Sequence, residues 1–157
     1  MEIEYTTLFS DMMEIDVSSV DSYVVRETDP FPTALDGELS KKNTSKSNIK
    51  SAKLSSLRLQ LWDFVYEDTL NHSNLKDLSE IVLEINAEGL GATKVAYKMI
   101  PDVRTNAINF ILEDVELREY LKKDYFTMII KYKKRRPMYH DMSFIITPKF
   151  KIIADPL

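Results

Sequence analysis

The chain has 157 residues, of which 44% are hydrophobic and 29% are charged, so we expect one globular domain with room for an additional segment. It contains no cysteine, which excludes disulfides, thiolate catalysis and cysteine-ligated zinc. The acidic start lacks the pattern of a secretory signal, and no apolar run reaches the ~20 residues of a membrane span. We therefore expect a protein that is neither secreted by a signal peptide nor inserted in a membrane.

The net charge of −4 is unevenly distributed along the chain. Residues 1–39 carry ten acidic side chains and one basic side chain, whereas residues 40–157 have a net charge of +5. Opposite charges at the two ends of a chain allow copies to bind one another head to tail. Two solvated surfaces of opposite sign would give the same distribution, and the sequence leaves both interpretations open.

The first 39 residues predict an acidic, extended arm that carries short strands. Apolar and polar residues alternate around Ile3 and Tyr5, and residues 23–25 form a second β-like run. Prolines at positions 30 and 32 remove backbone donors and exclude a central strand there. Such an arm cannot bury its apolar side chains alone, so we expect it to lie on the body of the protein or on another subunit. These side chains form the first candidate protein interface: Met12, Met13, Ile15, Val17 and Phe31.

Residues 40–53 have the composition of a linker. They comprise five lysines, four serines, two asparagines and one threonine, with only Ile49 and Ala52 apolar. A segment of this composition cannot form a core. We therefore predict three segments, namely the arm (1–39), the linker (40–53) and a β-sandwich domain (54–157).

Downstream of the predicted linker, apolar residues recur with the period of two that is typical of half-buried strands. No long amphipathic helix separates these runs, which disfavours a parallel α/β sheet. We predict an all-β, immunoglobulin-like antiparallel sandwich of about seven strands, with one short helix from Asp114 to Lys123. The predicted strands cover residues 57–61, 81–85, 95–99, 108–112, 125–132, 138–146 and 149–152.

The strands at 125–132 and 138–146 are expected to form a hairpin with a basic tip. This tip, the basic segment, is the second candidate protein interface and consists of Lys133, Lys134, Arg135 and Arg136. It could hold phosphates or an acidic protein surface, or it could be a solvated tip that keeps a sheet edge from pairing wrongly. We do not expect nucleic-acid binding, because the pI is about 5.3 and no reader motif is present.

Nothing in the sequence indicates catalysis or a cofactor. The two histidines, His72 and His140, do not have the spacing of metal ligands, and phosphate-binding and nucleophile motifs are missing. We therefore expect no enzymatic activity, no metal and no cofactor. Trp62, Phe64 and Tyr66 could form an exposed aromatic stripe, but we expect Trp62 and Phe64 in the core or in a subunit interface, where all-β domains bury such residues.

The order of features over residues 54–153 resembles the immunoglobulin-like N-terminal domain of phage baseplate upper proteins and related tail adaptors. The matching positions are packing residues rather than a catalytic motif, and the family's glycine before the hairpin tyrosine is Asp124 here. They are Leu75, Asp77, Leu78, Ser79, Leu121, Tyr125, Ser143 and Phe144.

The resemblance implies a non-enzymatic structural protein of a bacteriophage virion, in the baseplate or tail, the neck or the capsid surface. Such a protein would dock through its sandwich and its arm, and its partners would be other virion proteins and further copies of itself. It would be found in virions assembled in the host cytoplasm. The alternative is a soluble binding module or regulator that contacts an acidic protein through the basic segment.

Overall fold

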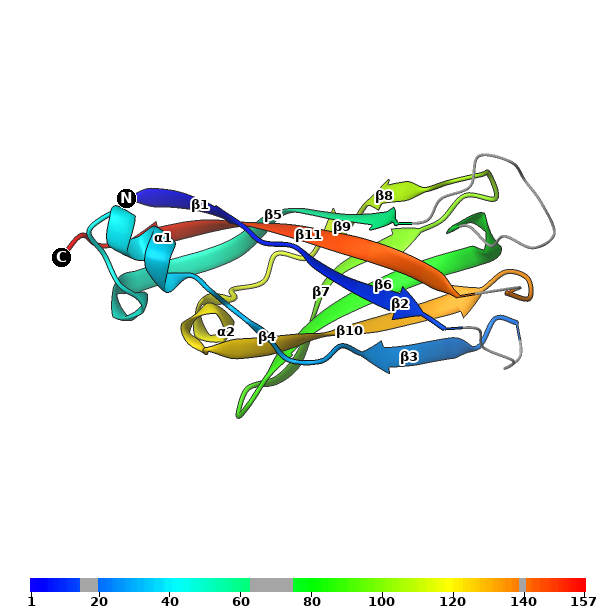
Figure 1. Cartoon of the computed structure of the whole chain (residues 1–157), viewed down its shortest axis with the longest axis horizontal. Helices are drawn as coiled ribbons and strands as arrows, with labels where there is room; N and C mark the ends of the chain where they lie inside the picture. The colour runs from blue at the N-terminus through cyan, green and yellow to red at the C-terminus, as the bar shows by residue number, and fades with distance from the viewer. Residues whose placement is uncertain (15–19, 63–74, 139–140) are drawn as a thin grey trace.

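Two antiparallel sheets pack face to face in the computed structural model, which describes residues 1–14, 20–62, 75–138 and 141–157 (Figure 1). The prediction of an all-β sandwich is confirmed. One sheet has five strands in the order β1-β11-β5-β8, with β2 also paired to β11. The other has six strands in the order β3-β10-β6-β7-β9, with β4 also paired to β10. We call them the first and the second sheet.

The described residues form eleven strands: four come from the predicted arm, and seven, the number predicted for the sandwich, lie between Ile49 and Ala154. The elements of the first sheet are β1 (Glu2–Thr6), β2 (Phe9–Met13), β5 (Ile49–Leu61), β8 (Ala107–Asn109) and β11 (Met142–Ala154). Those of the second are β3 (Tyr23–Glu27), β4 (Phe31–Pro32), β6 (Leu78–Ala87), β7 (Gly91–Met99), β9 (Ile111–Leu112) and β10 (Tyr125–Lys134). The helical elements are α1 (Asp36–Lys41), η1 (Lys46–Asn48), η2 (Leu75–Asp77) and α2 (Arg118–Lys122).

The core is built by alternation along the two longest central strands. On β10, Phe126, Met128, Ile130 and Tyr132 point inward, each at most 3% exposed, as the period of two predicts. On β11 every second residue from Met142 to Ala154 is buried. The tight turn between β6 and β7 has Gly89 and Gly91 at φ values of 78° and 75°, which favour glycine.

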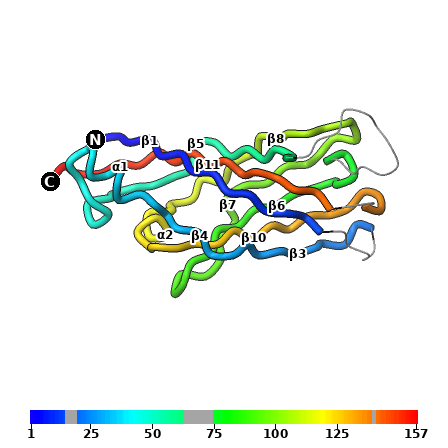
Figure 2. The backbone as a smooth tube through the Cα atoms, in the orientation of Figure 1, coloured from blue at the N-terminus to red at the C-terminus, as the bar shows by residue number. Residues whose placement is uncertain are grey.

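The predicted arm lies on the body of its own chain. Strands β1 and β2 follow one another along β11, and strands β3 and β4 do the same along β10. The segment therefore completes one edge of each sheet, and Figure 2 shows its trace running beside β11 and then beside β10. Ile3 and Tyr5 are 4% and 6% exposed, so their alternation marks a strand that packs on the core.

A proline explains why β1 and β2 are two strands rather than one. Pro148 of β11 lies opposite the gap between them, and its carbonyl accepts the N–H of Thr7 at 3.2 Å. Proline has no N–H to return, so the ladder is interrupted at this point. Leu8, the next residue, is 68% exposed.

The predicted linker is also part of the folded body. Its first residues end α1, whose Leu39 is fully buried, and its last five belong to β5. Ile49 and Ala52 face the core, while the lysines and serines around them occupy the outer face of β5. A half-exposed strand with Lys and Ser on its outer face has the composition of a linker, and this is why the sequence suggested a boundary here.

The predicted hairpin at 125–146 is wrong, because its two strands lie in different sheets. β10 pairs with β3, β4 and β6, whereas β11 pairs with β1, β2 and β5. The chain crosses from one sheet to the other after Lys134. Alternation specifies which face of a strand is buried but not which strand lies beside it, and this is the physical reason for the error.

The predicted helix is shorter than expected and is not capped by Asp114. It begins at Arg118 and ends at Lys122, after Leu117 at the N-cap position. Asp114 pairs with Lys53 Nζ at 2.6 Å, and Glu116 accepts the backbone N–H of Ala52 at 2.7 Å. The acidic residues before α2 thus bind β5 along the part of its edge that β8 does not cover.

Candidate protein interface

The basic segment spans the end of β10 and is bound to its own chain. Lys133 Nζ lies 3.7 Å from Glu80 Oε2 and 4.4 Å from the centre of the Tyr23 ring. Lys134 is the last residue of β10 and is 1% exposed. Neither lysine therefore projects from the tip of a hairpin.

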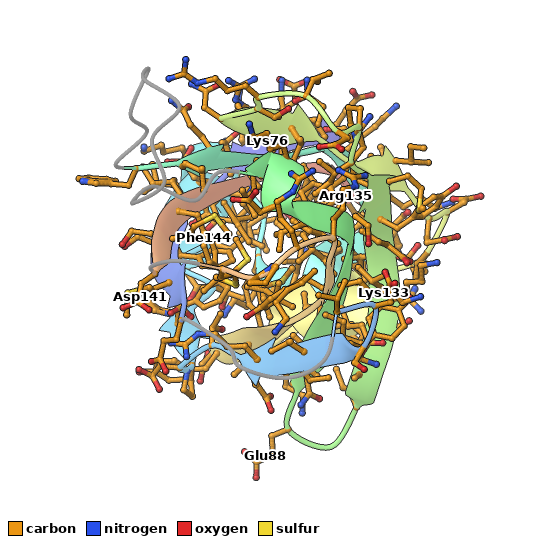
Figure 3. The ribbon with its side chains drawn as sticks, turned by 90° about the vertical axis from the view of Figure 1, so that its right-hand side faces the viewer. Lys76, Glu88, Lys133, Arg135, Asp141 and Phe144 are labelled. Carbon is orange, nitrogen blue, oxygen red and sulfur yellow. The ribbon has the colours of Figure 1, made fainter. Side chains whose placement is uncertain are left out.

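Arg135 and Arg136 join the end of β10 to two neighbouring segments. Arg135 donates to the carbonyls of Lys76 at 2.9 Å and Ile100 at 2.6 Å, and its backbone N–H donates to Asp77 O at 2.7 Å. Figure 3 shows Arg135 beside Lys76, with Lys133 further along the second sheet. The basic segment is therefore placed to stabilise this end of the sandwich.

Arg136 binds two carboxylates. It donates to Asp102 at 2.7 Å and to Asp77 at 3.2 Å, and Asp77 is 5% exposed. The hydrogen bond from Arg136 lowers the pKa of Asp102, and the same bond raises the pKa of Arg136. A buried carboxylate needs such a partner, so this pair has a structural role whatever else the segment binds.

The candidate residues of the arm are divided between core and surface. Met13 is fully buried, and Met12 on the opposite side of β2 is partly buried. Phe31 stacks on Phe9 of the first sheet with ring centroids 4.4 Å apart and meets Phe126 of the second sheet at 4.2 Å. Phe31 therefore joins the two sheets within one chain. The other two candidates, Ile15 and Val17, lie outside the described residues.

An ion pair joins the same two edges nearby. Arg26 of β3 donates to Asp11 Oδ1 of β2 at 2.8 Å, and this hydrogen bond raises the pKa of Arg26. Along this edge the two sheets are thus joined by the cluster of Phe9, Phe31 and Phe126 and by the partly buried Arg26–Asp11 salt bridge.

Trp62 marks an open pocket next to this ion pair. Its backbone N–H donates to Ser143 O at 2.8 Å, which continues the pairing of β5 with β11, and its side chain is 69% exposed. The pocket has a volume of about 350 Å³ and is lined by Ser10, Asp11, Met12, Arg26, Trp62, Ser143 and Phe144. Trp62 is therefore not a core residue; its role in a subunit interface stays a prediction. Phe64 and Tyr66 lie outside the described residues.

The neighbouring strand β3 exposes apolar side chains that the sequence did not single out as a site. Tyr23 and Val25 are 48% and 60% exposed, and they lie on the outer face of the second sheet. The run at 23–25 predicted a strand, but the sequence held no sign that this strand lies at an edge. Met12 and Trp62 line the pocket on the first sheet, whereas Tyr23 and Val25 are exposed on the outer face of the second sheet. These four residues lie on either side of the Arg26–Asp11 ion pair, and we call them the apolar corner.

A second pocket lies at the other end of β3, beside the β6–β7 turn. Its volume is about 760 Å³, and Glu27, Glu88 and Tyr125 are among its lining residues. Hydrogen bonds from Thr127 and Asn86 lower the pKa of Glu27, so that this carboxylate is bound within the sheet. Figure 3 shows Glu88 at the tip of the turn, away from the body.

The described ranges hold no candidate metal site. No group of three or more His, Asp or Glu side chains is placed to hold a metal ion there. Both histidines lie outside these ranges, so the structure places neither of them. None of the helices in the described part of the chain combines the length and the apolar composition needed to cross a bilayer.

Comparison with known proteins gives no family assignment. No protein-family model matches the chain, and no curated protein sequence matches it. Among solved structures, the chain is similar to one titled Desmodium yellow mottle tymovirus, with a TM-score of 0.33 and 10% sequence identity. The match covers 98% of this chain and 90% of the other.

Proposed function

We propose that this chain is a non-enzymatic structural protein of a bacteriophage virion that acts through protein–protein contacts. The observation that carries the proposal is the apolar corner. Aromatic residues, Met and Arg are enriched in protein interfaces, and exposed ones that gather beside a groove are typical of contact sites. Trp62, Met12 and Arg26 line one such groove, and Tyr23 and Val25 expose apolar side chains on the other face of β3.

The role in a virion is the more specific half of this proposal. It is supported by the resemblance to the N-terminal domains of baseplate upper proteins and tail adaptors. The apolar matching residues Leu75, Leu78, Leu121 and Phe144 are fully buried, as packing residues of such a domain would be. Within a virion we propose an adaptor position in the baseplate or tail, the neck or the capsid surface.

We propose a mode of docking in which the N-terminal segment does not reach to a neighbouring subunit. Residues 2–32 supply edge strands to both sheets of their own chain, so a neighbour would contact the finished sandwich. We place that contact at the apolar corner, where a partner could cover Trp62 without displacing any strand.

The test is whether the chain is a constituent of particles. Virus particles are purified on a density gradient, and the chain is quantified by mass spectrometry against the other particle proteins. We expect a fixed ratio across the particle peak. We also expect Trp62→Ala to lower incorporation at least tenfold, because aromatic anchors at interface centres cost about 2 kcal/mol or more when truncated. Val103→Ala, at a residue that is 58% exposed, is the matched control. Recovery of the wild-type chain only in the soluble fraction would overturn the proposal.

The alternative of a binding module that contacts an acidic partner through the basic segment has less support. Arg135 and Arg136 are already bound to backbone carbonyls and carboxylates of their own chain. A partner would have to displace these contacts before it could use the charges.

A further inference from the structure

The orientation of the β3 backbone shows which of its hydrogen-bonding groups are free to bind. The N–H of Thr28 donates to Met128 O of β10 at 2.9 Å, and residues 23–27 continue in the same register. Because bonding direction alternates along an antiparallel strand, Val24 and Arg26 point their backbone groups toward β10. Tyr23, Val25 and Glu27 point theirs away from the sheet.

No strand in the described part of the chain pairs with that outer side of β3. Three N–H groups and three carbonyls are therefore aligned at a sheet edge, and this is a template for another strand. The side chains of the same three residues are exposed on the outer face. An incoming strand would thus gain both backbone hydrogen bonds and apolar contacts with Tyr23 and Val25.

We propose that a second copy of this chain pairs with β3 through its own β3, antiparallel and about a twofold axis at Val25. In this register Val25 lies opposite Val25 of the second copy, and Tyr23 lies opposite its Glu27. All three residues with outward-facing backbone groups then face one another, as a hydrogen-bonded ladder requires. The two six-stranded sheets would become one continuous sheet. The inference rests on the proposed function only in that the apolar corner is a protein contact.

Charge favours this arrangement over a parallel one. Lys133 of β10 adjoins the Tyr23 end of β3, with its ammonium over the Tyr23 ring and 3.7 Å from Glu80 Oε2, and the opposite end of β3 carries Glu27. Antiparallel pairing brings Glu27 of one copy toward Lys133 of the other. Parallel pairing would instead place the two Glu27 carboxylates side by side. The charges at the two ends of β3 therefore favour a second copy of this chain as its partner.

The ladder ends close to these five residues. Asp21 has a left-handed φ of 69° at one end, and β3 ends at Glu27 at the other. Asp21 and Asp29 would lie near one another just beyond its ends, which adds a small repulsion. So short a contact buries less than the ~1,600 Å² of a standard interface, and we expect a reversible dimer with a Kd in the range of about 10–100 µM.

The experiment is sedimentation velocity on the full chain from 5 to about 500 µM. The decisive variant is Val25→Pro, which removes an outward N–H that the fold does not use and is compatible with an edge strand. A second variant, Val25→Lys, places two cations opposite each other at the twofold axis. Val103→Lys is the matched control, since Val103 is 58% exposed and Val25 is 60% exposed.

We expect the wild type and Val103→Lys to dimerise alike, and both Val25 variants to bind at least tenfold more weakly with an unchanged melting temperature. A wild type that stays monomeric throughout would overturn the inference, and so would Val25 variants that dimerise like the wild type. If Val25→Pro unfolds, the assigned backbone orientation is wrong. Particle incorporation without dimerisation would refute this inference alone, while dimerisation without incorporation would refute the virion role alone.

Discussion

The replacement of Phe31 by alanine tests whether residues 1–39 are part of the folded sandwich. Phe31 lies on β4 and contacts Phe9 at 4.4 Å and Phe126 at 4.2 Å, so it connects the two sheets. Nearby, the Tyr5 hydroxyl donates to the carbonyl of Thr33, which also joins the sheets. Removal of the ring therefore leaves a gap at the side of the sandwich that these strands close.

The expected loss follows from the burial of the ring. Phe→Ala at a fully buried site costs about 3–5 kcal/mol. Phe31 is partly buried, which lowers this figure, but it also loses two aromatic contacts of about 0.5–1.5 kcal/mol each. We expect the free energy of unfolding to fall by about 2–3 kcal/mol. With a urea m-value of about 2 kcal/mol/M, the midpoint should fall by about 1 M or slightly more.

Urea unfolding followed by far-UV circular dichroism measures this change, and Leu8→Ala is the control. Leu8 belongs to the same segment and is 68% exposed, so its loss should change stability by less than about 0.5 kcal/mol. If Phe31→Ala were as mild as Leu8→Ala, the packing of β4 between the sheets would be refuted. Phe31 would then be available as the interface residue that the sequence suggested.

Three further predictions concern the rest of the fold. Burial alone would raise the pKa of Glu116, but hydrogen bonds such as that from the Ala52 N–H give a net lowering. The ionised Glu116 therefore stabilises the fold above its unfolded pKa, and this stabilisation is lost as the pH falls through its folded pKa. In urea melts, Glu116→Gln should therefore lower the free energy of unfolding by about 1 kcal/mol at pH 7, a figure already reduced for solvent exposure, and hardly change it at pH 3. An equal loss of stability at both pH values would contradict this prediction. Arg135→Ala removes the donor to Ile100 O and should cost about 1–3 kcal/mol, so an unchanged melting temperature would refute a structural role. Deletion of residues 1–48 exposes the edges of β10 and β11 and should give an aggregating chain without a cooperative transition; a stable monomer would count against the integrated fold.

The alternation of apolar and polar residues predicted most of the strands after residue 54, because the face on which a side chain lies depends only on its position along its own strand. A side chain on a strand faces the core or the solvent depending on its parity, so Phe126, Met128 and Ile130 could be assigned to one face from the sequence. Pairing partners depend instead on the path of the chain between sheets. The alternating pattern of β10 and β11 is equally compatible with a hairpin and with two facing sheets.

Charge runs were harder to interpret than apolar patterns. The cations of residues 133–136 suggested a solvated tip, yet Arg135 reaches a carbonyl 35 positions earlier in the chain, at Ile100. The lysines of residues 40–53 suggested a linker, yet Ile49 and Ala52 bring this segment into the core. In both cases the deciding partners are remote in sequence, and composition carries no information about them. The role of Val25 depends in the same way on the position of β3 at the edge of a sheet.

Hydrogen exchange of individual amides, followed by NMR in dilute protein, tests the central claim that the N-terminal segment completes its own sandwich. Thr7 donates to Pro148 O and Ala154 donates to Met1 O, so by alternation the amides of Ile3 and Tyr5 point toward β11 and that of Glu4 points away. We expect Ile3 and Tyr5 to exchange slowly at every concentration and Glu4 to exchange rapidly. Fast exchange at all three amides, or protection of Ile3 and Tyr5 that appears only in concentrated protein, would mean that the segment is free or lies on a neighbour.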